Sequence, residues 1–191
     1  PTNWSIAGIG DFDGDGKADI IWRDAGGTTA LWTMNGASVT SNPAFAFVTT
    51  DWSIAATGDF NGDGKADIIW RHTSGAASMW QMNGPAIIGN SVFAAVPTSW
   101  TIAGVGDFDG DGLIDLAIGA PGAHGSGGVY LYSRARLPQM TTTFTDPDAE
   151  LRSETEGEGF GTTVLVTDLD GDGYDDVVVG GPRYNPDPTT A

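Results

Sequence analysis

Short apolar runs separated by acidic or glycine-containing turns recur along the chain. In the first stretch, residues 6–9 form a short apolar run that leads into an acidic loop, and residues 18–22 form a run that is apolar after its aspartate. A continuous apolar run of this length favours a strand that is covered on both faces. Residues 28–34 form a third run, which ends at an Asn-Gly turn signal, and residues 44–48 form a weaker fourth. The pattern predicts four short strands and no helix.

The same pattern recurs at a regular interval. Trp4, Trp52 and Trp100 are equally spaced, and each is followed by Ser or Thr and then by Ile-Ala. The first two copies are identical at 27 of 48 aligned positions, which chance does not produce. A fourth, more divergent copy occupies residues 159–181, and its acidic loop begins later than the regular interval after that of the third copy. The third copy therefore carries an insertion.

Four short strands in each unit of this length are the sequence signature of a β-propeller blade. A solenoid has shorter repeats, and a β-sandwich does not repeat with this fidelity. We therefore predict an all-β fold, a β-propeller built from four-stranded blades of about 48 residues, with about 3.5 blades in this chain. The predicted blades are residues 1–48, 49–96, 97–158 with an inserted acidic loop, and 159–191 as a partial blade.

Two segments are predicted to be irregular. Residues 145–159 are polar and acidic and read as a solvated loop, and the tail 182–191 is rich in proline. Because a partial fourth blade does not close a ring, we expect either further blades or other copies of the chain to complete it. An engineered or self-assembling propeller fragment is a further alternative, suggested by the near-identity of the first two units.

Composition narrows the classes of function. The chain has 191 residues, with 25 acidic and 8 basic side chains and a formal net charge of −17, so binding to nucleic acid or to an anionic membrane through bulk charge is excluded. The absence of Cys excludes disulfides, thiolate zinc sites and a cysteine nucleophile. No apolar run approaches the length of about 18 residues that a membrane-spanning helix needs, so no membrane insertion is predicted.

The negative charge is concentrated in four copies of one pattern, D-x-[DN]-x-D-G-x-x-D, which hold 15 of the 25 acidic residues. The copies place side-chain oxygens at Asp11, Asp13, Asp15 and Asp19; at Asp59, Asn61, Asp63 and Asp67; at Asp107, Asp109, Asp111 and Asp115; and at Asp168, Asp170, Asp172 and Asp176. Carboxylates so close together repel one another, and a hard divalent cation reverses the sign of that interaction. The pattern predicts up to four bound Ca²⁺ ions.

The spacing suits calcium, with side-chain oxygens at loop positions 1, 3, 5 and 9 and a backbone carbonyl at position 7. The seventh residues, predicted to bind through their carbonyls, are Lys17, Lys65, Leu113 and Tyr174. Their variety is expected if the side chain points away from the ion. The sixth residue is always glycine, which permits the sharp turn around the ion. Magnesium is disfavoured because it demands stricter geometry and retains several waters.

The loops have two other interpretations, an EF-hand and a metal-free turn. An EF-hand is excluded, because the twelfth position holds Trp22, Trp70, Ile118 or Val179 instead of a bidentate Glu, and because strands flank the loop. The loops could also be metal-free turns, since Asp and Gly are ordinary turn residues. Four copies with oxygens at the same positions favour the metal site.

The third and fourth copies carry residues that identify a family. The fourth begins with Gly159-Phe160-Gly161 and has Gly180-Gly181-Pro182 after its loop, and the third has Gly119-Ala120-Pro121 followed by GSGGVYLYS at residues 125–133. This resembles the FG-GAP repeat of integrin α-subunit β-propellers, where Phe-Gly and Gly-Ala-Pro bracket a calcium loop. The first two copies resemble the related FG-GAP/VCBS repeats of bacterial secreted proteins, although they lack both marks. The resemblance implies a calcium-stabilised propeller, commonly seven-bladed, used in adhesion or ligand recognition or attached to secreted enzymes.

Other residue types leave alternatives open. Trp22 and Trp70 follow the loops, and Trp32 and Trp80 lie in the third strands. Exposed indoles would suit stacking on sugars, but large residues at equivalent blade positions usually pack between blades. Arg23 and Arg71 recur beside the first pair, where they would stack on it or donate hydrogen bonds; a role in ligand binding is the alternative.

No catalytic residues are predicted. Neither His72 nor His124 has a Ser or Cys partner that spacing identifies, so a hydrolytic triad is disfavoured. The glycines of residues 119–128 lack the lysine of a phosphate loop. We therefore expect a non-enzymatic, calcium-binding propeller, extracellular or on the cell surface, with a protein or carbohydrate ligand. The rival hypothesis is an accessory region of a secreted enzyme that acts on polysaccharide.

Overall fold

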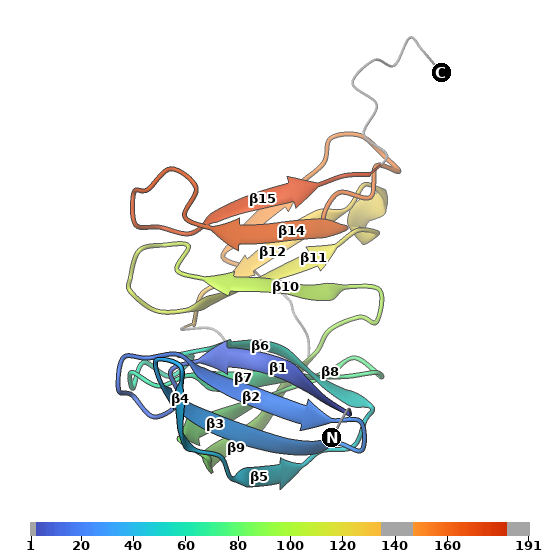
Figure 1. The fold of residues 1–191 in the computed structure, drawn as a ribbon. Coiled ribbons are helices and arrows are strands. Elements are labelled where there is room, and N and C mark those ends of the chain that lie inside the picture. The colour runs from blue at the N-terminus through green and yellow to red at the C-terminus, as the bar shows by residue number, and fades with distance from the viewer. Residues whose placement is uncertain (1–2, 135–146, 183–191) are drawn as a thin grey trace. The chain divides into compact units, whose positions relative to one another are not determined.

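The computed structural model describes residues 3–134 and 147–182, and the predicted irregular tail beyond Pro182 lies outside them. The described chain is all-β, and its strands form antiparallel sheets, mostly of four strands (Figure 1). It divides into two compact units, Pro1–Ala95 and Val96–Ala191, which are described separately. The described residues contain one short 3₁₀ helix, η1 (Ala123–Gly125). None of the described helical structure has the length and apolar character of a membrane span.

The sheet of the first repeat has five strands. They are β1 (Trp4–Gly10), β2 (Asp19–Asp24), β3 (Thr28–Asn35), β4 (Ser38–Ser41) and β5 (Ala44–Phe47). The first four follow one another in order as an antiparallel meander, and β5 pairs with β3 beside β4. The predicted strands at residues 6–9, 18–22, 28–34 and 44–48 are therefore present, and the Asn35-Gly36 turn joins β3 to β4. The short strand β4 was not predicted, because its sequence, SVTS, is polar and exposed.

The second repeat forms a simple four-stranded meander. Its strands are β6 (Trp52–Gly58), β7 (Asp67–His72), β8 (Ala76–Asn83) and β9 (Ala86–Ala95). The single long strand β9 takes the place of β4 and β5 in the first repeat. The strands β1 and β6 are neighbours, so the two sheets of this unit lie against each other.

Apolar side chains from both sheets form the core of this unit. Ile21 and Leu31 of the first sheet pack with Ile68, Trp70 and Met82 of the second, and all five side chains are buried. Phe12 and Ala66, which belong to the acidic loops, complete the cluster. The loops are therefore anchored in the core at the junction of the two sheets.

The other unit contains the third repeat and part of the fourth. Its strands are β10 (Thr101–Gly106), β11 (Asp115–Ala120), β12 (Gly128–Tyr132) and β13 (Ala149–Arg152) in one sheet, and β14 (Thr163–Thr167) and β15 (Asp176–Gly180) in a two-stranded sheet. All six residues of β11 are buried. Coverage on both faces was predicted for residues 18–22, and there the prediction was wrong. In β2, Ile21 is buried but Ile20 and Trp22 are only half-buried, because Trp22 lies at an open pocket.

The prediction that residues 145–159 form an irregular, solvated loop was wrong in two places. Residues 149–152 form the outer strand β13, which pairs with β12. Within this strand the Glu150 carboxylate accepts a hydrogen bond from Arg152 Nη2 at 2.5 Å. Glu158 is buried, with 5% of its surface exposed, and its carboxylate accepts a hydrogen bond from the Ser153 hydroxyl. The pairing of residues 149–152 and the burial of Glu158 depend on tertiary contacts, which composition does not reveal.

Close contact between backbone segments requires glycine at Gly127 of the third repeat and at Gly161, which follows Phe160 in the fourth. Phe160 pairs with Gly127, and its N–H donates to Ser126 O at 3.2 Å. Gly127 has φ of 97° and Gly161 has φ of 87°, in the left-handed region that favours glycine. A Cβ at Gly161 would collide with Gly128 O. The start of the fourth repeat is thereby fastened to the glycine-rich segment of the third.

Candidate cation-binding loops

The four acidic loops occupy the same place in every repeat, between the first and second strands. They connect β1 to β2, β6 to β7, β10 to β11 and β14 to β15. The sixth-position glycines turn as predicted, with φ of 81° at Gly16, 82° at Gly64, 79° at Gly112 and 95° at Gly173. The sharp turn expected from the sequence is therefore confirmed in all four loops.

The first carboxylate of each loop organises the turn. Asp11 accepts hydrogen bonds from the N–H groups of Gly14 at 2.8 Å and Gly16 at 2.7 Å. The equivalent bonds are made by Asp59 with Gly62 and Gly64, by Asp107 with Gly110 and Gly112, and by Asp168 with Gly171 and Gly173. The fourth position is also glycine with positive φ in every loop, a second requirement that the sequence interpretation had overlooked.

The remaining predicted side-chain ligands are held by the backbone in the same way. In the first loop, Asp13 accepts from Asp15 N at 3.2 Å, and Asp15 accepts from Lys17 N at 2.9 Å. The ninth-position Asp19 is fully buried and accepts from Phe12 N at 3.0 Å and Met34 N at 2.8 Å. The backbone likewise holds Asn61, Asp63 and Asp67; Asp109, Asp111 and Asp115; and Asp170, Asp172 and Asp176.

These bonds bring carboxylate oxygens together. Oxygens of Asp11, Asp13 and Asp15 lie within 4.8 Å of one another. The same limit holds for Asp107, Asp109 and Asp115, and for Asp168, Asp170 and Asp176. The second loop shares the hydrogen-bond pattern but offers an amide oxygen at Asn61. Clustered carboxylate and amide oxygens are the donor set that calcium takes, so these residues fit a calcium ion. Their role as ligands stays a prediction.

The pKa values of three carboxyl groups in the loops are raised. Burial, together with the Asp63 and Asp59 carboxylates, raises the pKa of Asp67 to about 6, although backbone amides of Met82 and Phe60 oppose the shift. Burial, with repulsion from Asp19 and Asp15, also raises the pKa of Asp13. Burial likewise raises the pKa of Asp115. A bound divalent cation would offset both causes.

The seventh-position side chains do not simply point away from the loops, as the sequence had suggested. Lys17 returns to its own loop, where its Nζ lies 2.6 Å from Asp15 Oδ2. Lys65 and Tyr174 instead cover the fourth-position glycines of the preceding loops, Gly14 and Gly110. These side chains therefore have a structural role that the sequence pattern did not show.

The tryptophan pairs of the first two repeats have the same geometry and different surroundings. The rings of Trp22 and Trp32 are 5.1 Å apart, and those of Trp70 and Trp80 are 5.0 Å apart. Trp70 is 1% exposed and has the Arg23 guanidinium 5.3 Å from its ring centroid. The expected packing between repeats, and the stacking of an arginine, are confirmed for this ring.

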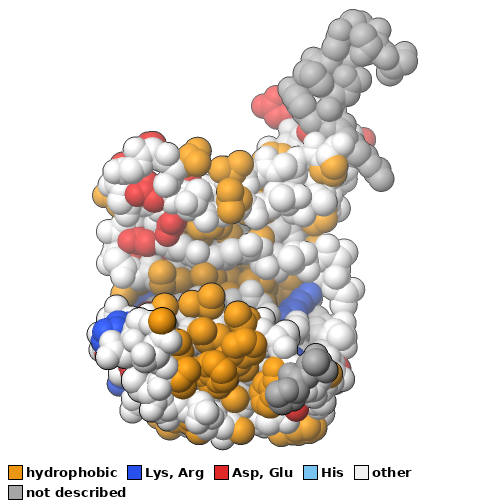
Figure 2. Space-filling model, in the orientation of Figure 1, with side chains coloured by type: hydrophobic (Ala, Val, Ile, Leu, Met, Phe, Trp, Pro, Cys, Tyr) orange, Lys and Arg blue, Asp and Glu red, His pale blue; other side chains and the backbone are white. Residues whose placement is uncertain are grey.

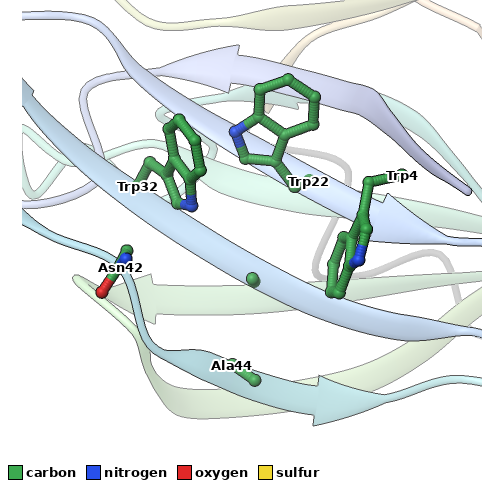
Figure 3. A pocket seen from close by; sticks show the side chains of 6 residues that line it. Trp4, Trp22, Trp32, Asn42 and Ala44 are labelled. Carbon is green, nitrogen blue, oxygen red and sulfur yellow. The ribbon is translucent and has the colours of Figure 1, made fainter. Parts of the chain in front are cut away.

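The Trp22–Trp32 pair is open instead. With Trp4, Ala30, Asn42 and Ala44 it lines a pocket of about 430 Å³ (Figure 3). Figure 2 shows hydrophobic side chains gathered on this face of the first repeat. The Asn42 amide lies at the edge of the pocket, so indole faces and a polar group are offered together.

His72 has partners that the sequence interpretation missed. Its Nε2 is 2.6 Å from Asp51 Oδ2, and its Nδ1 is 2.6 Å from Ser74 Oγ. Ser74 N–H also donates to Nδ1 at 3.0 Å, which places the ring proton on Nε2. The order of groups resembles that of a hydrolytic triad, but it also closes a tight turn, since Gly75 N donates to His72 O. The signal available in the sequence was the His-x-Ser spacing.

Comparison with protein families agrees with this geometry. Residues 11–70 and 59–118 match the model of an FG-GAP-like repeat, and residues 160–191 match that of an FG-GAP repeat. A search of curated proteins found no relative of the chain. Repeats of this type often bind Ca²⁺ and are typical of extracellular proteins. The matched segments contain all four acidic loops.

Proposed function

The chain belongs to the FG-GAP-like repeat family, and from this premise we propose that it is a non-enzymatic, calcium-binding module of β-propeller type that mediates adhesion or ligand recognition outside the cell. The observation that carries the proposal is the recurrence of a cluster of carboxylate oxygens at the same strand connection in the first, third and fourth repeats. Consecutive four-stranded meanders that pack against each other within a unit support the propeller architecture.

The ions would act on the connection between the first and second strands. The ninth-position carboxylate of each loop begins the second strand, while the first-position carboxylate directly follows the first strand. A bound Ca²⁺ supplies positive charge that neutralises the carboxylates and ties both ends of the loop together. At a calcium concentration about a hundredfold above Kd, each site would stabilise the fold by about 2.7 kcal/mol.

The test of calcium binding is thermal unfolding with millimolar calcium and with chelator, combined with elemental analysis. We expect bound calcium in the purified protein and a higher Tm with calcium than with chelator. A Tm that is the same in both conditions, with no calcium detected, would contradict the proposal. Magnesium at the same concentration is the control, and we expect it to raise Tm less.

For the recognition role, the pocket of Trp4, Trp22 and Trp32 is the candidate surface. Indole faces beside an amide suit a sugar ring, which stacks its apolar face and uses its hydroxyls for hydrogen bonds. A glycan array with calcium and with chelator tests this point. Binding of a defined sugar class that Trp22→Ala abolishes would support a lectin-type role. A blank array with intact, calcium-loaded protein would favour a protein ligand.

A further inference from the structure

In each unit, the later acidic loop contacts the earlier one through its seventh and eighth residues. Ala66 N–H, at the eighth position of the second loop, donates to Asp11 O at 2.6 Å. In the other unit, Asp175 N–H, at the eighth position of the fourth loop, donates to Asp107 O at 2.8 Å. The two acceptors are the first residues of the first and third loops. One cross-repeat bond therefore occurs twice, at equivalent positions of different sequences.

Side chains reinforce this junction. A Cβ built on Gly14 would lie 3.2 Å from Lys65 Cε and 3.3 Å from Lys65 Cγ, so the lysine stem covers that glycine. The Tyr174 ring occupies the equivalent place over Gly110. Asp175 also accepts a hydrogen bond from Asp107 N–H at 3.0 Å, which makes that contact reciprocal. The earlier loop is thus supported at its first and fourth positions by the repeat that follows.

The chemistry of one peptide group connects the two loops. The N–H of Ala66 and the carbonyl of Lys65 belong to the same planar unit, so they cannot reorient independently. The Lys65 carbonyl is the predicted seventh-position ligand of the second loop. A cation on that carbonyl polarises the peptide and strengthens the hydrogen bond that its N–H donates to Asp11. Asp11 in turn is the first predicted ligand of the earlier loop.

We propose that neighbouring calcium loops within a unit are coupled through this shared peptide, so that filling the second loop raises the calcium affinity of the first. Lys65-Ala66 and Tyr174-Asp175 are then positioning residues for the sites of the preceding repeats. The inference rests on the proposed calcium binding. By thermodynamic linkage the effect is reciprocal, and filling the first loop raises the affinity of the second by the same factor.

The test measures this factor by calorimetric titration of the full chain. The third and fourth loops are first disabled with Asp107→Asn, Asp111→Asn, Asp168→Asn and Asp172→Asn. Asp59→Asn with Asp63→Asn then leaves the first loop alone, and Asp11→Asn with Asp15→Asn leaves the second alone. The ligand side chains of each substituted, empty loop carry the same net charge as those of the filled natural loop with its ion, −1 for the second and −2 for the first. In the unsubstituted pair the first ion instead binds beside an empty, more negative loop, so charge alone raises the measured factor. A variant that changes no charge therefore isolates the part of the factor that the shared peptide carries.

We expect the product of the two stepwise constants to exceed the product of the single-loop constants by about fivefold or more, the usual range of site coupling. Ala66→Pro removes the N–H donor, keeps the Lys65 carbonyl and changes no charge, so in the same set of variants it should lower the factor at least severalfold. An equal factor with and without Ala66→Pro would contradict the coupling. The matched control is Ala18→Pro, which makes the same backbone change at the eighth position of the first loop, where the side chain is exposed. This control should leave the factor unchanged.

A factor of one in the unsubstituted pair of loops would overturn the coupling and leave calcium binding intact, whereas no binding in any variant would overturn both. Amide hydrogen exchange gives a second measurement that does not depend on proline variants. In the protein with only the second loop active, calcium should slow exchange of the Ala66 amide at least severalfold. An unchanged exchange rate in calcium-loaded protein would also contradict the inference.

Discussion

The first two repeats have nearly the same sequence and present the same face in two different states. In the second repeat, Ile68, Trp70 and Met82 are at most 1% exposed, because the first repeat covers them. Their counterparts in the first repeat, Ile20, Trp22 and Met34, are all partly exposed. The comparison shows that one set of side chains is fully buried when covered and partly exposed when open. Sequence identity alone does not distinguish these outcomes.

Tryptophan substitutions at equivalent positions test this contrast with the largest expected effect. Trp70→Ala removes a fully buried ring and should lower the free energy of unfolding by about 3–5 kcal/mol. Trp22→Ala should cost clearly less, because its ring is already partly exposed to solvent. Urea unfolding followed by circular dichroism measures both. Equal losses for the two variants would contradict the assignment of covered and open faces.

Arg23 of the first repeat covers Trp70 of the second, and its substitution should have the next largest effect on the free energy of unfolding. Its guanidinium donates to the backbone carbonyls of Val48 and Thr49, each at 2.8 Å, and of Trp52, and it stacks on Trp70. Arg23→Met keeps an apolar stem and loses these bonds, which should cost about 1.5–3 kcal/mol in urea unfolding.

Arg23→Lys serves as the control, since it keeps the charge but lacks the planar fork. We expect it to recover only part of the loss. Full recovery would mean that charge alone, and not the fork geometry, holds the two repeats together.

Protonation of Asp67 makes a smaller contribution to the free energy of unfolding, and this contribution depends on pH. Its pKa of about 6 in the folded protein exceeds the ordinary value of 3.8, so between these values the folded state binds the proton more tightly. In metal-free protein its contribution therefore makes the unfolding free energy fall as pH rises from about 4 to about 6. Asp67→Asn should remove this part of the slope. Calcium affinity of the second loop should also fall below about pH 6, because protons compete with the ion.

Substitution of the lysines at the seventh position should have the smallest effect on stability to urea. Lys17 and Asp15 form an exposed ion pair, whereas Lys65 covers Gly14 of the preceding loop. Lys17→Ala should therefore leave the urea midpoint unchanged, because exposed pairs contribute little. Lys65→Ala should lower the midpoint measurably. The opposite order would show that the cross-repeat contact has no role in stability.

Much of this architecture could be predicted because the repeat places equivalent residues in register. The strands other than β4 and β13, the Asn35-Gly36 turn and the turns at Gly16 and its counterparts followed from apolar runs and turn residues. The oxygen positions of the loops followed from the spacing of aspartates, and the structure holds each of them with backbone N–H groups.

What could not be predicted depends on contacts between segments far apart in sequence. Strand β13 arises from residues 149–152 only because β12 offers an edge to pair with. The support of Asp11 by Ala66, which belongs to the following repeat, is likewise visible only in the structure. The same holds for His72, whose partner Asp51 lies in the connection between repeats.

Calorimetric titration of the chelator-treated chain with calcium measures whether the acidic loops bind calcium and how many ions they take. We expect saturable binding of up to four ions, and one ion fewer when Asp11→Asn and Asp15→Asn disable the first loop. Circular dichroism would confirm that the variant keeps its β-structure. Absence of saturable binding to folded protein, or an unchanged number of ions in the variant, would contradict the assignment of the acidic loops as calcium sites.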